Sequence, residues 1–176
     1  MKVIPTAELL AVEGGSYRDV ARRVQSGEFV RLRRGAIARR TDELQPHQRL
    51  RIDIEAASRV LQSGTWFSHR SAALIHGLPV VVGRDSKVEV IRTYGGHGKS
   101  SRLVHARAGA LDPDEASVVD GLRVTSLSRT VLDLVRTVPF GEAVMVADAA
   151  LRLGLPRDRL LESVPAGRGC RRAVLA

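Results

Sequence analysis

The chain has 176 residues, of which 44% are apolar and 27% are charged, so it can bury a hydrophobic core and is not a disordered tail. A single cysteine excludes an internal disulfide and a cysteine-cluster metal site, and the few aromatic residues argue against a surface that stacks single-stranded bases. No apolar run approaches the roughly 20 residues that span a bilayer, and we therefore expect a cytoplasmic protein without membrane segments.

Basic residues outnumber acidic ones by 28 to 19, which gives a net charge of +9, and 25 of the 28 are arginines. Residues 1–40 hold nine of the cations and four of the anions, and residues 22–40 hold the densest group. Such a cluster is the electrostatic footprint of a nucleic-acid surface, because guanidinium groups suit phosphate and guanine contacts. A solvated charged face without a ligand is the alternative.

The first part of this basic region predicts two short helices. The first helix begins at Pro5 and Thr6, with Thr6 able to cap it. The pair Gly14-Gly15 then breaks the helix. Ser16 is expected to cap a second helix that runs to about residue 26, with Asp19 as the acid of a capping box.

A basic hairpin follows, with strands predicted at residues 29–32 and 36–38 and a turn at residues 33–35. Two helices and a hairpin predict a winged helix-turn-helix domain over residues 1–41, in which the second helix enters the major groove of DNA. A short helical hairpin without a DNA role is the alternative, because no helix precedes the pair to complete a three-helix core. The predicted DNA-binding residues are Ser16, Tyr17, Arg18, Arg22, Arg23 and Gln25 on the helix, and Arg31, Arg33, Arg34, Arg39 and Arg40 on or beside the hairpin.

The remaining sequence mixes helices and strands, so the predicted fold class is α+β with a second, α/β domain over residues 42–164. Helices are predicted at residues 46–62, 68–76, 126–138, 141–153 and 157–163, with Ser68 capping the second of them. Strands are predicted at residues 65–67, 87–92, 103–106 and 118–124, the last forming a hairpin around Asp120-Gly121. Residues 165–176 are rich in Gly and Arg and are predicted to be a linker-like tail.

Enzyme motifs are incomplete along the whole chain. Residues 95–100 lack the first glycine of a phosphate loop, and Ser68 lacks the glycine elbow of a hydrolase nucleophile. The acidic residues 112–115 are not followed by a lysine at nuclease spacing. Arg129 and Asp133, four residues apart, are expected to form a structural ion pair, with Asp148 nearby. We therefore predict a protein that is not an enzyme and has neither a cofactor nor a metal site.

Several short segments, taken in order, resemble the AbiEi-type antitoxin family of type IV toxin–antitoxin systems. The resemblance covers about residues 5–164. It is carried by residues 31–38, 68–73, 76–79, 120–126, 129–134 and 147–151, which read RLRRGAIA, SHRSAA, HGLP, DGLRVTS, RTVLDL and ADAAL.

This resemblance implies a winged-helix N-domain that binds double-stranded DNA and represses its own operon. It also implies a second domain that counters a nucleotidyltransferase-like toxin without forming a stable complex. Many relatives carry a further restriction-endonuclease-like domain, and its absence from this sequence leaves open both a shorter family member and a truncated or decayed one. The alternative function is the DNA-targeting or regulatory half of a nuclease-type protein whose catalytic domain is missing.

Overall fold

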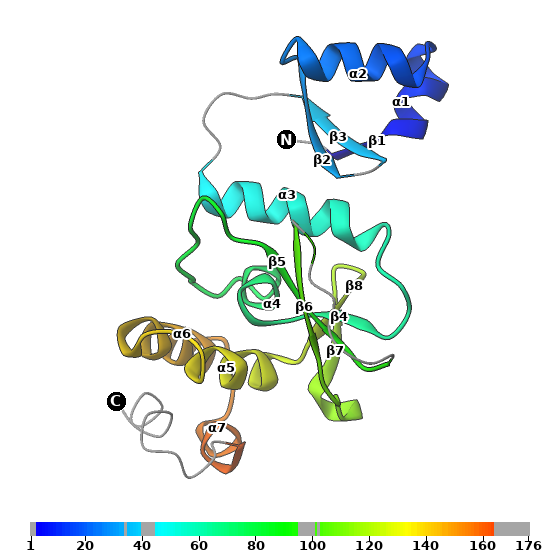
Figure 1. Cartoon of the computed structure of the whole chain (residues 1–176). Coiled ribbons are helices and arrows are strands. Elements are labelled where there is room, and N and C mark those ends of the chain that lie inside the picture. The colour runs from blue at the N-terminus through cyan, green and yellow to red at the C-terminus, as the bar shows by residue number, and fades with distance from the viewer. Residues whose placement is uncertain (1–2, 34, 40–44, 95–100, 102, 164–176) are drawn as a thin grey trace. The chain divides into compact units, whose positions relative to one another are not determined.

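The computed structural model describes residues 3–33, 35–39, 45–94, 101 and 103–163, and Figure 1 traces them. The chain has an α+β fold and divides into two compact units, residues 1–61 (unit 1) and residues 62–176 (unit 2). The boundary between the units therefore lies after residue 61, and not after residue 41 as the sequence pattern predicts. None of the helices in the described ranges is long and apolar enough to cross a bilayer.

Unit 1 contains a three-stranded antiparallel sheet and three helices. In chain order its elements are β1 (Val3–Pro5), α1 (Thr6–Glu13), α2 (Tyr17–Gln25), β2 (Phe29–Arg33), β3 (Ala36–Arg39) and α3 (Pro46–Ser58). The strand order is β1-β3-β2, so the first strand lies beside the hairpin strand that is farthest from it in sequence.

The sheet of unit 1 is covered on both faces because its strands alternate between two apolar clusters. Helices α1 and α2 cover one face and α3 covers the other (Figure 1). The first cluster contains Leu9, Val20, Phe29 and Ile37. The second contains Ala36, Ala38, Ile52 and Ala56. Helix α3, which the sequence analysis assigns to the second domain, therefore packs on the sheet of unit 1.

The start of unit 1 differs from the sequence-based prediction, which contains no strand before the first helix, whereas the structure has β1 there. The extended chain runs to Pro5, and the backbone N–H of Thr6 donates to the carbonyl of Gly35 at 2.8 Å. The cap position of α1 is therefore Pro5, no side chain caps the helix, and the prediction that Thr6 is its cap is wrong. The predicted capping box of α2, formed by Ser16 and Asp19, is confirmed.

Unit 2 is built on a five-stranded mixed sheet of order β6-β5-β4-β8-β7. Strands β4 and β8 are parallel, as are β5 and β6, whereas the other two pairs are antiparallel. The elements are β4 (Thr65–Phe67), α4 (His69–Ile75), β5 (Val88–Arg92), β6 (Val104–Ala108), β7 (Ala116–Val119), β8 (Leu122–Thr125), α5 (Leu127–Val135), α6 (Phe140–Arg152) and α7 (Arg157–Ser163), with a short 3₁₀ turn, η1 (Pro113–Glu115), before β7.

The hairpin between β7 and β8 confirms its sequence signal. Asp120 and Gly121 both have positive φ, 50° and 75°, as a type I′ turn requires. The helical core of unit 2 lies between α4, α5, α6 and α7, and α5 and α6 lie side by side (Figure 1). Its fully buried members include Ala73, Val131, Leu134, Val146 and Leu160.

Candidate nucleic-acid interface

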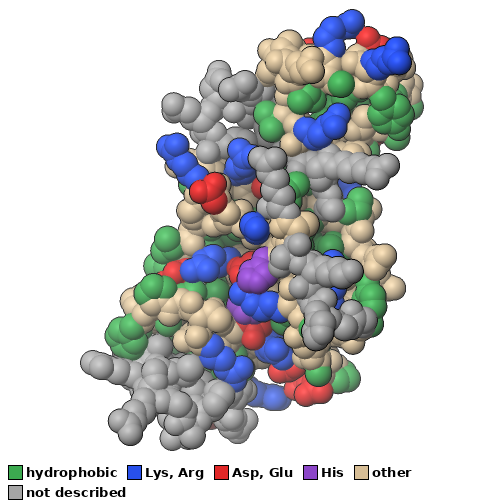
Figure 2. Space-filling model, viewed as in Figure 1, with side chains coloured by type: hydrophobic (Ala, Val, Ile, Leu, Met, Phe, Trp, Pro, Cys, Tyr) green, Lys and Arg blue, Asp and Glu red, His purple; other side chains and the backbone are tan. Residues whose placement is uncertain are grey.

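Helix α2 presents a polar face to solvent. Val20 on its opposite side is only 2% exposed, whereas Tyr17 is 67% exposed and the side chain of Arg22 is 76% exposed. Arg18 and Gln25 are exposed as well. Arg18, Arg22 and Gln25 are four and three positions apart and therefore share one side of the helix, and Tyr17 is exposed at its N-terminal end. We call these four residues the α2 face. Basic side chains lie over the region of α1 and α2 in Figure 2.

The hairpin of unit 1 adds two exposed arginines. Arg31 lies opposite Ile37, and Arg39 lies opposite Phe29. Because directly opposed residues share a face, both arginines lie on the side of the sheet that α1 and α2 cover. Their side chains are exposed. Arg34 and Arg40 lie outside the described residues, as does the side chain of Arg33.

Arg23 is held inside unit 1, in contrast to the prediction that it binds DNA. Its guanidinium donates to Glu13 at 2.8 Å and to Glu28 through two bonds of 2.8 and 2.5 Å. It also lies 4.4 Å from the centre of the Phe29 ring. Hydrogen bonds to Glu28 and Glu13 raise the pKa of Arg23 further above its ordinary value. We therefore remove Arg23 from the interface, because its donors connect α2 to Glu13 of α1 and to Glu28 just before β2.

Ser16 is likewise used inside unit 1. Its hydroxyl accepts a bond from the backbone N–H of Asp19 at 3.3 Å and donates to the Asp19 carboxylate at 2.8 Å. We assign Ser16 to the cap of α2 rather than to DNA contact. Arg39 is intermediate, since Glu13 and Glu28 lie 3.6 and 3.9 Å from a guanidinium that is 60% exposed.

Replacing Arg23 by glutamine is expected to lower the melting temperature of the protein. The change removes the closer shared partner of Glu13 and Glu28 and the nearer of two guanidinium groups above Phe29, and leaves the carboxylates only their longer contacts with Arg39. Arg22→Gln on the exposed side of the same helix is the control. Thermal unfolding followed by circular dichroism measures both melting temperatures. Equal melting temperatures for the two variants would contradict the assignment of Arg23 to the fold of unit 1.

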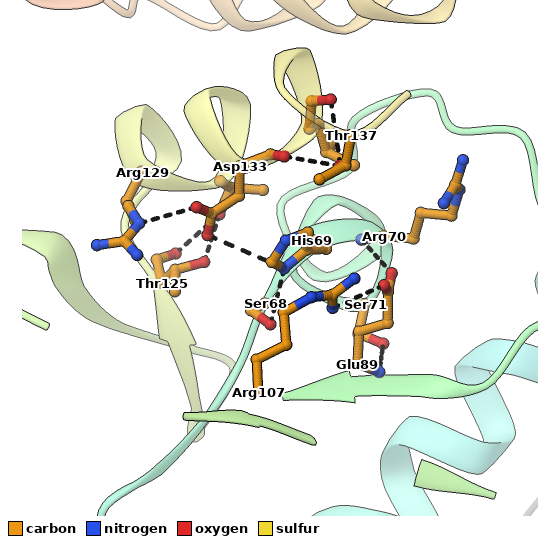
Figure 3. A network of polar contacts seen from close by, with 12 residues as sticks. Ser68, His69, Arg70, Ser71, Glu89, Arg107, Thr125, Arg129, Asp133 and Thr137 are labelled. Carbon is orange, nitrogen blue, oxygen red and sulfur yellow. Dashed lines mark hydrogen bonds and ion pairs between the residues drawn. The ribbon is translucent and has the colours of Figure 1, made fainter. Parts of the chain in front are cut away.

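Unit 2 holds a buried polar network at the edge where β4 and β8 end. Phe67 of β4 lies beside Val124 of β8, so the residues that follow both parallel strands meet at one place. Figure 3 shows this group, and Figure 2 shows histidine beside basic and acidic side chains on unit 2. We call it the polar network, and its members are Ser68, His69, Arg70, Ser71, Glu89, Arg107, Thr125, Arg129 and Asp133.

The cap of α4 is not the one predicted. Ser68 occupies the cap position, but its side chain makes no capping bond. Its hydroxyl lies 3.1 Å from Nδ1 of His69 instead. The first-turn N–H of Arg70 donates to Glu89 at 3.0 Å, and the backbone N–H of Glu89 donates to the hydroxyl of Ser71 at 2.9 Å. Glu89 of strand β5, and not Ser68 as predicted, therefore accepts a hydrogen bond from the first turn of α4.

The predicted pair of Arg129 and Asp133 is confirmed, with a bond of 3.0 Å. Arg129 also donates to Glu115 of the acidic segment at 2.6 Å. Asp148 is not part of this group, because it pairs with Arg152 on the exposed side of α6. The second oxygen of Asp133 is buried without a hydrogen-bond partner among the described residues.

His69 lies at the centre of the polar network in an uncommon backbone conformation. Its φ is +49°, in the left-handed region where residues other than glycine are strained. Burial, together with the charges of Arg107 and Arg129, lowers the pKa of His69 to about 3. The ring is therefore neutral at physiological pH, and its 4.0 Å separation from Asp133 is not an ion pair.

The polar network does not have the geometry of a catalytic triad. In a triad, the nucleophile and the acid approach opposite nitrogens of the histidine ring. Here Ser68 and Asp133 both approach Nδ1, and Ser68 is fully buried. His76 does not complete a site, because its Nε2 bonds to the carbonyl of Thr125 at 2.8 Å. Within the described ranges, no three His, Cys, Asp or Glu side chains gather as metal ligands.

The free energy of unfolding is expected to fall on acidification from about pH 6.5 toward pH 3, by up to about 1.4 kcal/mol per pH unit. In this range the unfolded chain protonates the imidazole of His69, but the folded chain does not. Burial raises the pKa of Asp133, which acts in the opposite direction and reduces the slope. Urea unfolding at several pH values measures how the free energy of unfolding changes with pH. His69→Asn should flatten the profile, whereas the control His47→Asn, at an exposed histidine, should not. Equal slopes in all three proteins would contradict this role of His69.

Comparisons with known proteins show the fold. No family model matches the chain, and no curated protein is found as a relative. Among solved structures, the crystal structure of RV2827C protein from Mycobacterium tuberculosis is similar over 99% of this chain and 70% of that chain, with a TM-score of 0.59 and 15% sequence identity. At this identity the likeness concerns the architecture alone.

Proposed function

We propose that the chain is a DNA-binding, antitoxin-like transcriptional regulator that binds duplex DNA through unit 1. The observation that carries the proposal is the α2 face. Its capped helix packs through Val20 onto the sheet of unit 1, while Tyr17, Arg18, Arg22 and Gln25 remain exposed. A helix of this kind, preceded by another helix and followed by a hairpin, suits insertion into the major groove.

The charges around the α2 face favour this role over a merely solvated surface. Arg23, on the other side of α2, takes both Glu13 and Glu28, whereas on the α2 face Asp19 is the one acid paired with an arginine, Arg22, among the described residues. Arg18 and Arg31 stay exposed on the α2 face and on the hairpin, so both are available for phosphate oxygens. The chain as a whole carries a net charge of +9, which favours approach to a polyanion.

The antitoxin part of the proposal rests on the resemblance of short segments to the AbiEi-type family. Three of these segments, residues 68–73, 120–126 and 129–134, meet in or beside the polar network of unit 2. We propose that unit 2 serves to counter a nucleotidyltransferase-type toxin, that the chain is not itself an enzyme, and that the polar network maintains the fold of unit 2.

A mobility-shift titration tests the DNA-binding proposal. The full chain is titrated onto a labelled duplex from the region upstream of its own gene, and onto a shuffled duplex of equal length and composition. We expect retardation of both duplexes, with the upstream duplex binding at lower protein concentration. Absence of any shift at low salt would refute the proposal.

The neighbouring genes test the antitoxin part. A nucleotidyltransferase gene alongside supports it. A downstream reading frame with an intact carboxylate–lysine nuclease motif would instead favour the alternative, in which this chain targets a nuclease to DNA.

A further inference from the structure

The three arginines of α2 have three different environments. Arg23 is committed to Glu13, Glu28 and the Phe29 ring. Arg18 is exposed and makes no hydrogen bond or ion pair within the described residues. Arg22 lies between these extremes, since its NH2 group donates to Asp19 at 2.8 Å while its side chain remains 76% exposed. Arg23 therefore stabilises unit 1, Arg18 extends into solvent, and Arg22 is exposed but held by one bond to Asp19.

Asp19, the partner of Arg22, is itself fixed in place. Its Oδ2 accepts from the backbone N–H of Ser16 at 2.9 Å and from the Ser16 hydroxyl at 2.8 Å. Its Oδ1 is left to accept from Arg22. Hydrogen bonds from Ser16 lower the pKa of Asp19, so the carboxylate is charged at neutral pH. The bonds between Ser16 and Asp19 at the helix cap thus fix the carboxylate that holds the Arg22 guanidinium, one turn further along the helix.

We propose that Arg22 reads a guanine in the major groove, and that Asp19 is the positioning residue that presents its guanidinium. This inference rests on the proposed DNA binding by unit 1 and assigns its base preference. The guanidinium has five N–H donors, of which one is bonded to Asp19, and the others have no partner within the described residues. Two of these donors match the O6 and N7 acceptors of guanine.

A base contact suits Arg22 better than a phosphate contact does. The Asp19 carboxylate beside it would repel a phosphate group, whereas it can accept a bond from the N4 amino group of a cytosine. Arg18, with no acid in contact, suits the phosphate role. Ala21 lies between these two arginines on the helix and carries only a methyl group, so the helix backbone can approach the base edges closely. We therefore expect the α2 face to bind preferentially to a G·C pair that lies beside the N-terminal turns of α2.

Selection of duplexes from a random library by the full chain tests this inference. We expect the selected duplexes to share a G·C pair, and replacement of its guanine by 7-deazaguanine, which lacks the N7 acceptor, to weaken binding about tenfold. Arg22→Lys keeps the charge but loses the forked donors. This variant should bind duplexes with and without the G·C pair almost equally well, and the salt dependence of its binding should not change.

Arg18→Lys is the matched control, and it should leave the preference intact. Asp19→Asn, checked for folding by circular dichroism, should also weaken the preference. An unchanged preference in Arg22→Lys, or duplex binding by the wild type without any base preference, would overturn the role of Arg22 but leave DNA binding standing. Failure of the wild type to bind any duplex would overturn both the inference and the proposed function.

Discussion

Replacing Glu89 by alanine is expected to lower the free energy of unfolding by about 3 kcal/mol. The Glu89 side chain is only 11% exposed, and its two oxygens accept from the backbone N–H of Arg70 and from the guanidinium of Arg107, both at 3.0 Å. The variant leaves the first turn of α4 uncapped and Arg107 without its carboxylate. Both losses fall on the polar network that joins α4 to the sheet of unit 2.

Two further variants show how much of this loss in unfolding free energy comes from the missing cap of α4. Glu89→Gln retains an oxygen for the N–H of Arg70 but loses the ion pair with Arg107, so its effect should be intermediate. Ser68→Ala removes only the contact with His69 and should cost about 1 kcal/mol or less. Urea unfolding followed by circular dichroism gives all three values. A loss in Ser68→Ala equal to that in Glu89→Ala would show that Ser68 supports α4 after all.

Replacing Arg18, Arg22 and Arg31 together by glutamine is expected to weaken duplex binding by about a hundredfold or more near 0.1 M salt. Loss of the phosphate contacts of Arg18 and Arg31 removes roughly one decade of affinity each at this salt concentration, because fewer counterions are released, and loss of the Arg22 base contact weakens binding further. The three side chains are exposed in unit 1, so the folded structure should be retained.

The matched control removes three exposed arginines of unit 2, Arg84, Arg136 and Arg152, and so lowers the net charge by the same amount. Fluorescence anisotropy with a labelled duplex measures both variants. Equal weakening in the two triple variants would mean that net charge, and not the α2 face with the hairpin, determines binding.

Local signals in the sequence account for most of the elements. The Ser16 and Asp19 capping box, the Asp120-Gly121 turn and the spacing of Arg129 and Asp133 each involve residues within a few positions of each other. Such signals depend on helix and turn geometry alone, so they can be predicted without knowledge of the fold.

Contacts between distant segments could not be predicted in this way. Strand β1 is three residues long and is defined by its pairing with β3, more than thirty positions away. The acceptor for α4 comes from Glu89, nineteen residues beyond Arg70. Asp19 completes a capping box with Ser16, whereas Ser68 is followed three residues later by Ser71 and its hydroxyl lies beside His69. The sequence near Ser68 gives no sign that Glu89 of another strand supplies the acceptor.

The predicted DNA-binding residues show the same limit. Helical spacing correctly places Arg18 and Arg22 on the exposed side of α2. It could not show that Arg23 is taken by Glu13 and Glu28, because these acids lie ten positions before it and five after it, outside helical spacing. Charge density alone therefore overestimates the interface, since it counts an arginine that stabilises unit 1.

The salt dependence of duplex binding tests the central claim most directly. Affinity of the full chain for a labelled duplex is measured from low to physiological salt, for the wild type and for a variant with Arg31, Arg33 and Arg34 replaced by alanine. Five to seven phosphate contacts predict a slope of roughly −4 to −6 in the plot of log affinity against log salt, and a shallower slope for the variant. A slope near zero, or binding that is the same in the variant, would contradict DNA binding through unit 1.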